Sequence, residues 1–230
     1  MRAKLSASRT DRRGSDSCLE DRELDQAWLA LDDSAFEAIP RSGAHAGPFL
    51  GRVLVRALRD HLTVTPTDSN LRDKPIMIRL EPPLPPRLRV YLYAATQHSS
   101  ERQAGTFRIQ LTNKGNPVLD TKPQRYTFNR AGGVRCLLLG YNEALHTFIL
   151  WDADLQDASP GYPYSKGVQA PPSVVYAAVS KGLAEETRRL RNPNRTETII
   201  AARPDRLAEA IERRVDLSIR ALTSEVLPGC

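Results

Sequence analysis

A long apolar hairpin constrains the fold of this chain more than any other feature of its sequence. Residues 136–140 are almost continuously apolar, as in a strand that is buried on both faces. Residues 146–151 form a second run that is mainly apolar, and only a few residues around Asn142 and Glu143 separate the two. So short a connection returns the second strand antiparallel to the first. We therefore expect this hairpin at the centre of a sheet.

Apolar periodicity predicts the other elements. Alternating or apolar runs predict strands at 75–81, 88–95, 107–112 and 196–202, with a further short strand around Val168. Helical spacing of apolar residues predicts helices at 20–38, from Pro48 to about residue 62, at 172–182 and from about residue 204 onward. The sum is an α+β fold, in which a central, mainly antiparallel sheet of about five to six strands is flanked by three to four helices.

The same reading divides the chain into three parts. Residues 1–18 are polar and basic and are expected to be a disordered tail. Residues 20–66 are expected to be a helical N-terminal segment, and residues 75–223 the α+β core. No apolar run reaches the roughly 20 residues that a membrane helix needs, and the three cysteines form no metal or disulfide pattern. A cytoplasmic protein that does not contact a membrane is expected.

The charge balance raises the question of nucleic acid. Lys and Arg number 33 against 27 acids, which gives a net charge of +6, and Arg dominates the basic set. Arg binds phosphate bidentately and stacks on bases, so the balance favours double-stranded DNA as a partner. A GC-rich genome, which favours Arg over Lys, explains the composition equally well.

Two segments have the residues that DNA contacts need. Residues 113–133 form a long irregular region that mixes basic and aromatic side chains, and its candidate phosphate contacts are Lys122, Arg125 and Arg130. The second segment, Tyr162, Pro163, Tyr164, Ser165 and Lys166, offers rings, a hydroxyl and a cation that could hold a base and its phosphate. Alternatively, its tyrosines pack back on the sheet. Further candidate contacts are the outward-facing Arg108 and the basic run Arg188, Arg189 and Arg191.

A nuclease is the enzymatic alternative. Restriction-type nucleases hold Mg²⁺ between an acid and an acid-x-Lys motif. The nearest match is Asp120 and Lys122 with Asp152 as the other acid. An acid at the end of a strand more often caps the turn that follows, and the position of Asp152 favours this role over metal binding. No phosphate-binding loop and no metal-ligand motif occurs, so no metal or cofactor is expected unless the chain is a Mg²⁺-dependent nuclease.

Six sequence blocks resemble a known family. They read LRVYLYAAT at 88–96, FRIQL at 107–111, LLLGY at 137–141, FILWDA at 148–153, YSKGVQ at 164–169 and IAARPD at 200–205. Their order and spacing, over roughly residues 50–215, are similar to the methylase-associated domain of bacterial restriction–modification loci, whose members are often labelled restriction endonucleases. The resemblance implies an acid and a Lys ahead of the third strand, where this chain has residues 105–108, Gly-Thr-Phe-Arg. This departure favours recognition over cleavage.

Three hypotheses follow from the residues and the resemblance. The first is a DNA-binding recognition module of a restriction or host-defence system, which reads a modified base or backbone. The second is a divergent Mg²⁺-dependent restriction endonuclease. The third is a non-catalytic partner subunit of a methyltransferase or nuclease. The amphipathic terminal helices could in addition form a homodimer.

Overall fold

A computed structural model describes residues 48–97, 105–111, 127–156, 166–190 and 195–226, with the side chains of the last helix described as far as residue 223. The chain divides into two units, Met1–Gly43 and Ala44–Cys230, and every described residue belongs to the second. The predicted tail at 1–18 and the predicted helix at 20–38 lie outside the described residues. No helix in the described ranges is both long enough and apolar enough to cross a membrane.

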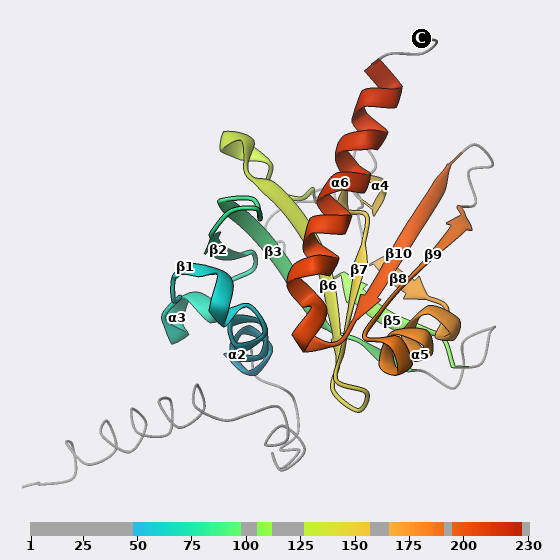
Figure 1. The fold of residues 1–230 in the computed structure, drawn as a ribbon, viewed down its shortest axis with the longest axis horizontal. Coiled ribbons are helices and arrows are strands. Elements are labelled where there is room, and N and C mark those ends of the chain that lie inside the picture. Colours follow the sequence, from blue (N-terminus) through green and yellow to red (C-terminus); the bar gives the residue numbers. More distant parts are fainter. Residues whose placement is uncertain (1–47, 98–104, 112–126, 157–165, 191–194, 227–230) are drawn as a thin grey trace, which may run out of the picture. The chain divides into compact units, whose positions relative to one another are not determined.

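The α+β fold class is confirmed. A seven-stranded sheet runs in the order β1-β2-β3-β6-β7-β10-β9, and only the β3–β6 pair is parallel. Its strands are β1 (Leu62–Val64), β2 (Ile76–Leu80), β3 (Arg87–Ala94), β6 (Arg135–Asn142), β7 (Thr147–Trp151), β9 (Leu183–Arg189) and β10 (Thr196–Ala202). The apolar hairpin is the β6–β7 pair, and it lies in the middle of this sheet (Figure 1).

A second, smaller sheet was not predicted. Its order is β4-β5-β8, and all its pairs are antiparallel. These strands are β4 (Thr96–Gln97), β5 (Phe107–Leu111) and β8 (Lys166–Ala170). The predicted strand at 107–112 and the short strand around Val168 therefore pair with each other instead of joining the central sheet.

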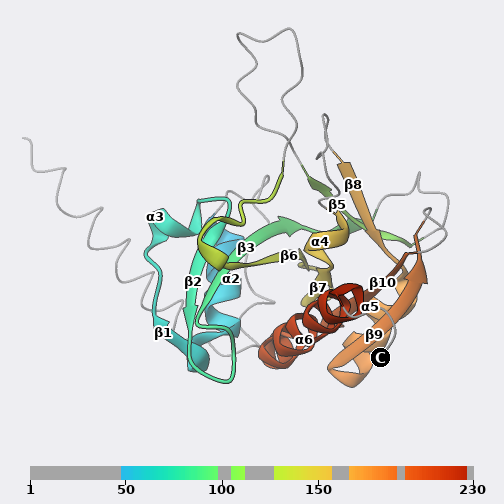
Figure 2. The ribbon, with the colours of Figure 1, turned by 90° about the horizontal axis from the view of Figure 1, so that it is seen from above.

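Helices cover both faces of the large sheet. They are α2 (Pro48–Ala57), α3 (Asp68–Leu71), α4 (Ala153–Gln156), α5 (Pro172–Lys181) and α6 (Leu207–Val226), with 3-10 turns at Arg59–His61, Ala131–Gly133 and Pro204–Arg206. Because side chains alternate along a strand, Ile199 and Ala201 of β10 pack with α5 and the small sheet. Ile200 and Ala202 point to the other face, where α6 begins with buried Leu207 and Ile211. Figure 2 shows the small sheet and α6 on opposite sides of β6 and β7.

Gly140 lets the two sheets approach closely. It lies in β6, and a Cβ atom there would come within 2.7 Å of Ile109 of the small sheet and 2.9 Å of the Trp151 ring. Contacts that short are not tolerated in a packed core. Trp151 also donates from its indole nitrogen to the carbonyl of Gln169, at 2.8 Å, and so ties β8 to β7.

Three details differ from the sequence prediction. The helix from Pro48 ends at Ala57, and Leu62, expected on its apolar stripe, begins β1. The charged stretch 184–195, for which no strand was predicted, contains all of β9 except its first residue. Helical spacing predicts a core stripe of Leu207, Ile211, Val215, Ile219 and Leu222 in α6. This stripe is wrong at its end, because Ile219 and Leu222 are 45% and 47% exposed and the buried side continues through Arg214 and Ser218.

Candidate functional site

One strand register brings together the ends of the two segments predicted to contact DNA. Leu111 ends β5 and Lys166 begins β8, and these two residues are direct partners in the small sheet. The chain leaves Leu111 into residues 112–126 and arrives at Lys166 from residues 157–165, both outside the described ranges. Neighbouring strands are about 5 Å apart. The first segment therefore begins, and the second segment ends, at the same end of the β5–β8 pair.

The other two ends are joined as well. Arg130, in the described last part of the first segment, forms an ion pair with Asp154 in α4, just before the second. Lys166 donates from Nζ to the carbonyl of Gln156, at 2.8 Å, and so links the two ends of the second segment. All four ends of the two segments are thus held by described side chains or backbone pairs.

The outer face of the small sheet lies next to these ends. This face consists of Thr96, Arg108, Gln110, Gly167 and Gln169, which are register partners across the three strands. Their inward neighbours Phe107, Ile109, Leu111, Val168 and Ala170 are buried. Among the described strands of this sheet no residue is acidic.

Gly167 and Gln110 position the Arg108 guanidinium. Arg108 donates to Oε1 of Gln110 at 2.6 Å. Its guanidinium lies across Gly167, where a Cβ atom would approach Nε of Arg108 to 2.8 Å. Arg and Gln are the side chains that make bidentate hydrogen bonds to guanine and adenine in the major groove. The outer face therefore presents side chains of the two types that can make such bonds, Arg108 on one strand and Gln110 and Gln169 beside it.

A largely buried polar cluster joins the end of β7 and α4 to β9, β10 and α6. It consists of Asp152, Gln156, Arg188, Glu197 and Arg214. Glu197 is fully buried and accepts four hydrogen bonds. Two come from the Arg188 guanidinium, at 2.7 and 3.1 Å, and the others come from the Gln156 amide at 2.7 Å and the Asp152 backbone N–H at 3.3 Å.

Both carboxylate oxygens of Asp152 are engaged. Oδ1 accepts from the backbone N–H groups of Asp154 and Leu155, at 2.9 and 3.3 Å, and so caps α4. Oδ2 accepts from the buried Arg214 at 3.1 Å. A metal ion at Asp152 would have to displace one of these donors. Within the described ranges, no three His, Cys, Asp or Glu side chains are placed to hold a metal ion.

Apart from Arg108 and Asp152, whose contacts are given above, the candidate residues fall into three groups. Eight lie outside the described residues: Asp120, Lys122, Arg125, Tyr162, Pro163, Tyr164, Ser165 and Arg191. Arg130, Lys166 and Arg188 hold the structural contacts described above, although each stays at least partly accessible. Arg189 is exposed at the end of β9 and makes no hydrogen bond or ion pair within the described part of the chain. Their roles toward DNA stay a prediction.

Glu197 and Arg214 were not identified from the sequence. Glu197 had a detectable signal, because it shares the inward side of its strand with Ile199 and Ala201. A charge at an inward strand position is rarely buried without a partner. Arg214 had no such signal, because its partner Asp152 is 62 residues away.

Comparison with known families gives one match. The model of the family described as methylase-associated X1 matches residues 86–211, which is more than half of the 230 residues. The matched range runs from the start of β3 into α6, so it includes the small sheet and the whole buried polar cluster except Arg214. Comparisons with the curated proteins and with the solved structures found no significant match. The chain therefore belongs to the methylase-associated X1 family.

Proposed function

We propose that this chain is a DNA-binding recognition module of a restriction or host-defence system, and that it reads modified DNA through the small sheet and the two segments anchored at its edge. The observation that carries the proposal is the Leu111–Lys166 pairing. It joins the ends of two segments that were each selected for DNA contact from sequence alone. The family's association with methylases connects the chain to systems in which DNA carries modified bases.

The division of labour follows from the side chains. Arg108, Gln110 and Gln169 would contact base edges, because their donors and acceptors match the major-groove code. Residues 113–130 and the basic end of the β9–β10 hairpin would contact phosphates, which position a protein but do not select a sequence. The segment from Tyr162 to Lys166 would hold the modified base or backbone group.

The test is a binding titration of the full chain on matched duplexes. Unmodified and methylated duplexes of one sequence are compared by gel shift at several salt concentrations. Wild-type protein should bind with an affinity that falls as salt rises, and should prefer one duplex. Replacing Arg108 with Ala should weaken binding to the preferred duplex by about tenfold, the loss expected for one base contact. Arg220→Ala, which removes an equal charge from exposed α6, is the matched control and should bind like wild type.

Other outcomes identify the alternatives. No shift on any duplex at low salt overturns the DNA-binding proposal. Plasmid cleavage with Mg²⁺ or Mn²⁺ that disappears in Asp152→Ala, with the fold retained, supports the nuclease with Asp120, Lys122 and Asp152. Stable co-purification with a methyltransferase, without DNA binding, supports the partner subunit.

A further inference from the structure

A group of basic side chains lies on β2 and β3 and just before β2, on strands that are not part of the small sheet. We call Lys74, Arg79, Arg87 and Arg89 the basic strip. Arg79 and Arg87 are direct cross-strand partners, and Arg89 is the partner of Met77 on the same face. Arg87 and Arg89 alternate with Leu88 and Val90, which are buried on the opposite face. The basic strip therefore lies on the face of the large sheet that also carries the small sheet.

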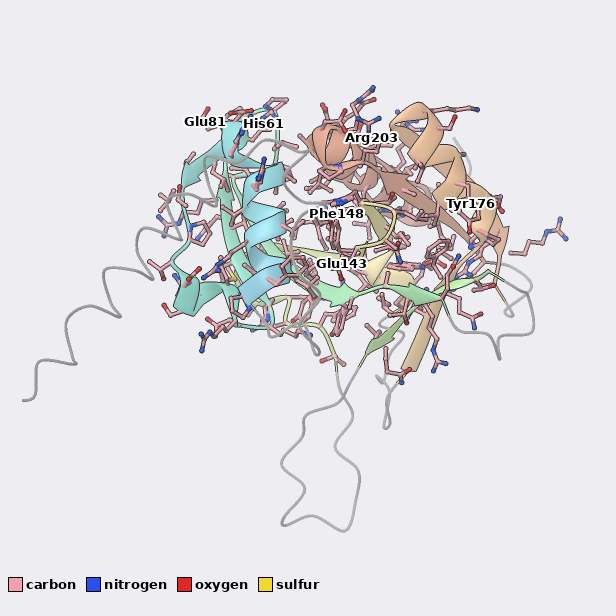
Figure 3. The ribbon with its side chains drawn as sticks, turned by 90° about the horizontal axis from the view of Figure 1, so that it is seen from below. His61, Glu81, Glu143, Phe148, Tyr176 and Arg203 are labelled. Carbon is pink, nitrogen blue, oxygen red and sulfur yellow. The ribbon has the colours of Figure 1, made fainter. Side chains whose placement is uncertain are left out.

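The Arg79–Arg87 pair is unfavourable in the isolated protein. Directly opposed residues of an antiparallel pair have Cβ atoms about 5 Å apart, and like charges there are destabilising. Both side chains are exposed, and neither forms an ion pair with any described residue. The nearest acid along the chain from Arg79 is Glu81, which lies beside His61 past the end of β2 (Figure 3). An anion between the two guanidinium groups would relieve this repulsion.

Arg89 connects the basic strip to the proposed site. Its guanidinium donates to the carbonyls of Asn129 and Ala131, at 3.1 and 2.5 Å. Because these acceptors are neutral, they fix the guanidinium and leave its positive charge in place. Arg130, between them in sequence, is the residue paired with Asp154 at the end of the first DNA-contacting segment. Lys74 is also held, with its ammonium group 4.3 Å from the centre of the Tyr93 ring.

We infer that the basic strip contacts the phosphate backbone of the DNA duplex, beyond the part that the small sheet reads. The inference rests on the proposed function. Guanidinium groups match phosphate oxygens bidentately, and the strip offers several on one rigid strand pair. The exposed Met77 and Val64 beside it, 46% and 53% accessible, add apolar contact area without acidic groups.

The experiment measures how binding depends on salt. The double variant Arg79→Gln with Arg87→Gln is titrated with a fluorescently labelled duplex between about 50 and 200 mM salt. Each lost phosphate contact should lower the magnitude of the slope of log K against log salt by about 1, hence by about 2 for the pair. The variant Arg79→Lys with Arg87→Lys keeps both charges and should keep the slope. Lys181→Gln with Arg220→Gln removes the same charge from exposed positions on α5 and α6 and should also keep it.

The outcomes separate this inference from the proposed function. The proposal that the basic strip contacts phosphates is overturned if the salt slope of the double variant Arg79→Gln with Arg87→Gln is unchanged. It is also overturned if the Lys181 and Arg220 control loses as much of the slope. If the salt slope of the Arg79 and Arg87 double Gln variant falls while Arg108→Ala binds like wild type, phosphate contact by the basic strip is supported. Base reading by the small sheet is then overturned. If wild-type protein shows no salt-dependent binding, both proposals are overturned.

Discussion

The guanidinium of Arg214 in α6 lies 3.1 Å from Oδ2 of Asp152 at the end of β7, and both side chains are buried. Arg214 also donates to the carbonyl of Thr198 in β10, at 2.7 Å. One side chain thus ties α6 to two central strands at the place where the hairpin ends. A second ion pair, between Glu197 and Arg188, lies on the other face of β10. The two acids of the polar cluster are thus each compensated by an Arg.

Replacing Asp152 with Ala should reduce stability strongly. The change leaves the buried Arg214 without its counter-ion and α4 without its cap. Removing one partner of a buried pair costs about 3–5 kcal/mol, which urea denaturation would measure as a lower free energy of unfolding. Asp154→Ala is the matched control, because its ion pair with Arg130 is largely exposed and should cost at most about 1 kcal/mol. Equal stabilities of the two variants would contradict a structural role for Asp152.

Gly140→Ala should separate the two sheets. The added methyl group collides with Ile109 and the Trp151 ring, neither of which can move far in a packed core. Overpacking of this kind costs about 1–3 kcal/mol. Thermal unfolding should show a lower Tm, whereas Gly133→Ala, where no atom lies within 4 Å, tests only the backbone strain of its positive φ of 64°. A wild-type Tm for Gly140→Ala would mean that the sheets do not approach as described.

Trp151→Phe should loosen β8 selectively. It removes the indole N–H that the Gln169 carbonyl accepts, while most of the ring volume is kept. A typical hydrogen bond contributes about 0.5–1.5 kcal/mol to stability, and this one is part-buried. Hydrogen exchange should become faster in β5 and β8 but stay close to wild type in the β2–β3 pair. Uniform acceleration across both sheets would show that the bond does not act locally.

The Glu185–Arg213 pair predicts a pH dependence. The hydrogen bond and charge of Arg213 in α6 lower the pKa of the Glu185 carboxyl in β9 below its ordinary value of 4.5. A lowered folded-state pKa gives stability that is present above the unfolded-state pKa and lost as the pH falls through the folded-state value. Glu185→Gln should therefore cost about 0.5 kcal/mol near pH 7, a value that allows for solvent screening of this half-exposed pair. The difference from wild type should shrink as the pH falls through the folded-state pKa of Glu185, and a difference that does not shrink on acidification would contradict the assignment.

The local apolar pattern of the sequence predicted most of the helices and strands. Alternation of Phe107, Ile109 and Leu111 correctly predicted which side of β5 is buried. Alternation does not say which strand pairs with which, so the separate small sheet was not predictable. β9 was missed because it is rich in charged residues, which bind partners on other elements. Arg188 pairs with Glu197 of β10, and Glu185 pairs with Arg213 of α6. An edge strand can keep such charges at little cost.

The site was less predictable than the fold for the same reason. Lys166 was selected from its neighbours in sequence, but its pairing with Leu111 spans 55 residues and leaves no local trace. Arg79 lies in the predicted strand 75–81 and Arg87 directly precedes the predicted strand 88–95. Only the strand register shows that the two residues lie opposite each other and that their positive charges are adjacent.

The shared edge at Leu111 and Lys166 has a consequence for how such a domain can diversify. Lengthening a loop adds little closure entropy, about 0.6 kcal/mol for each doubling. Because the ends at Leu111, Arg130, Gln156 and Lys166 are held by contacts outside both segments, either segment can gain, lose or exchange residues while the scaffold stays unchanged. Under the proposed function, changes within either segment would alter the DNA that is recognised while the strands and contacts that hold its ends stay the same.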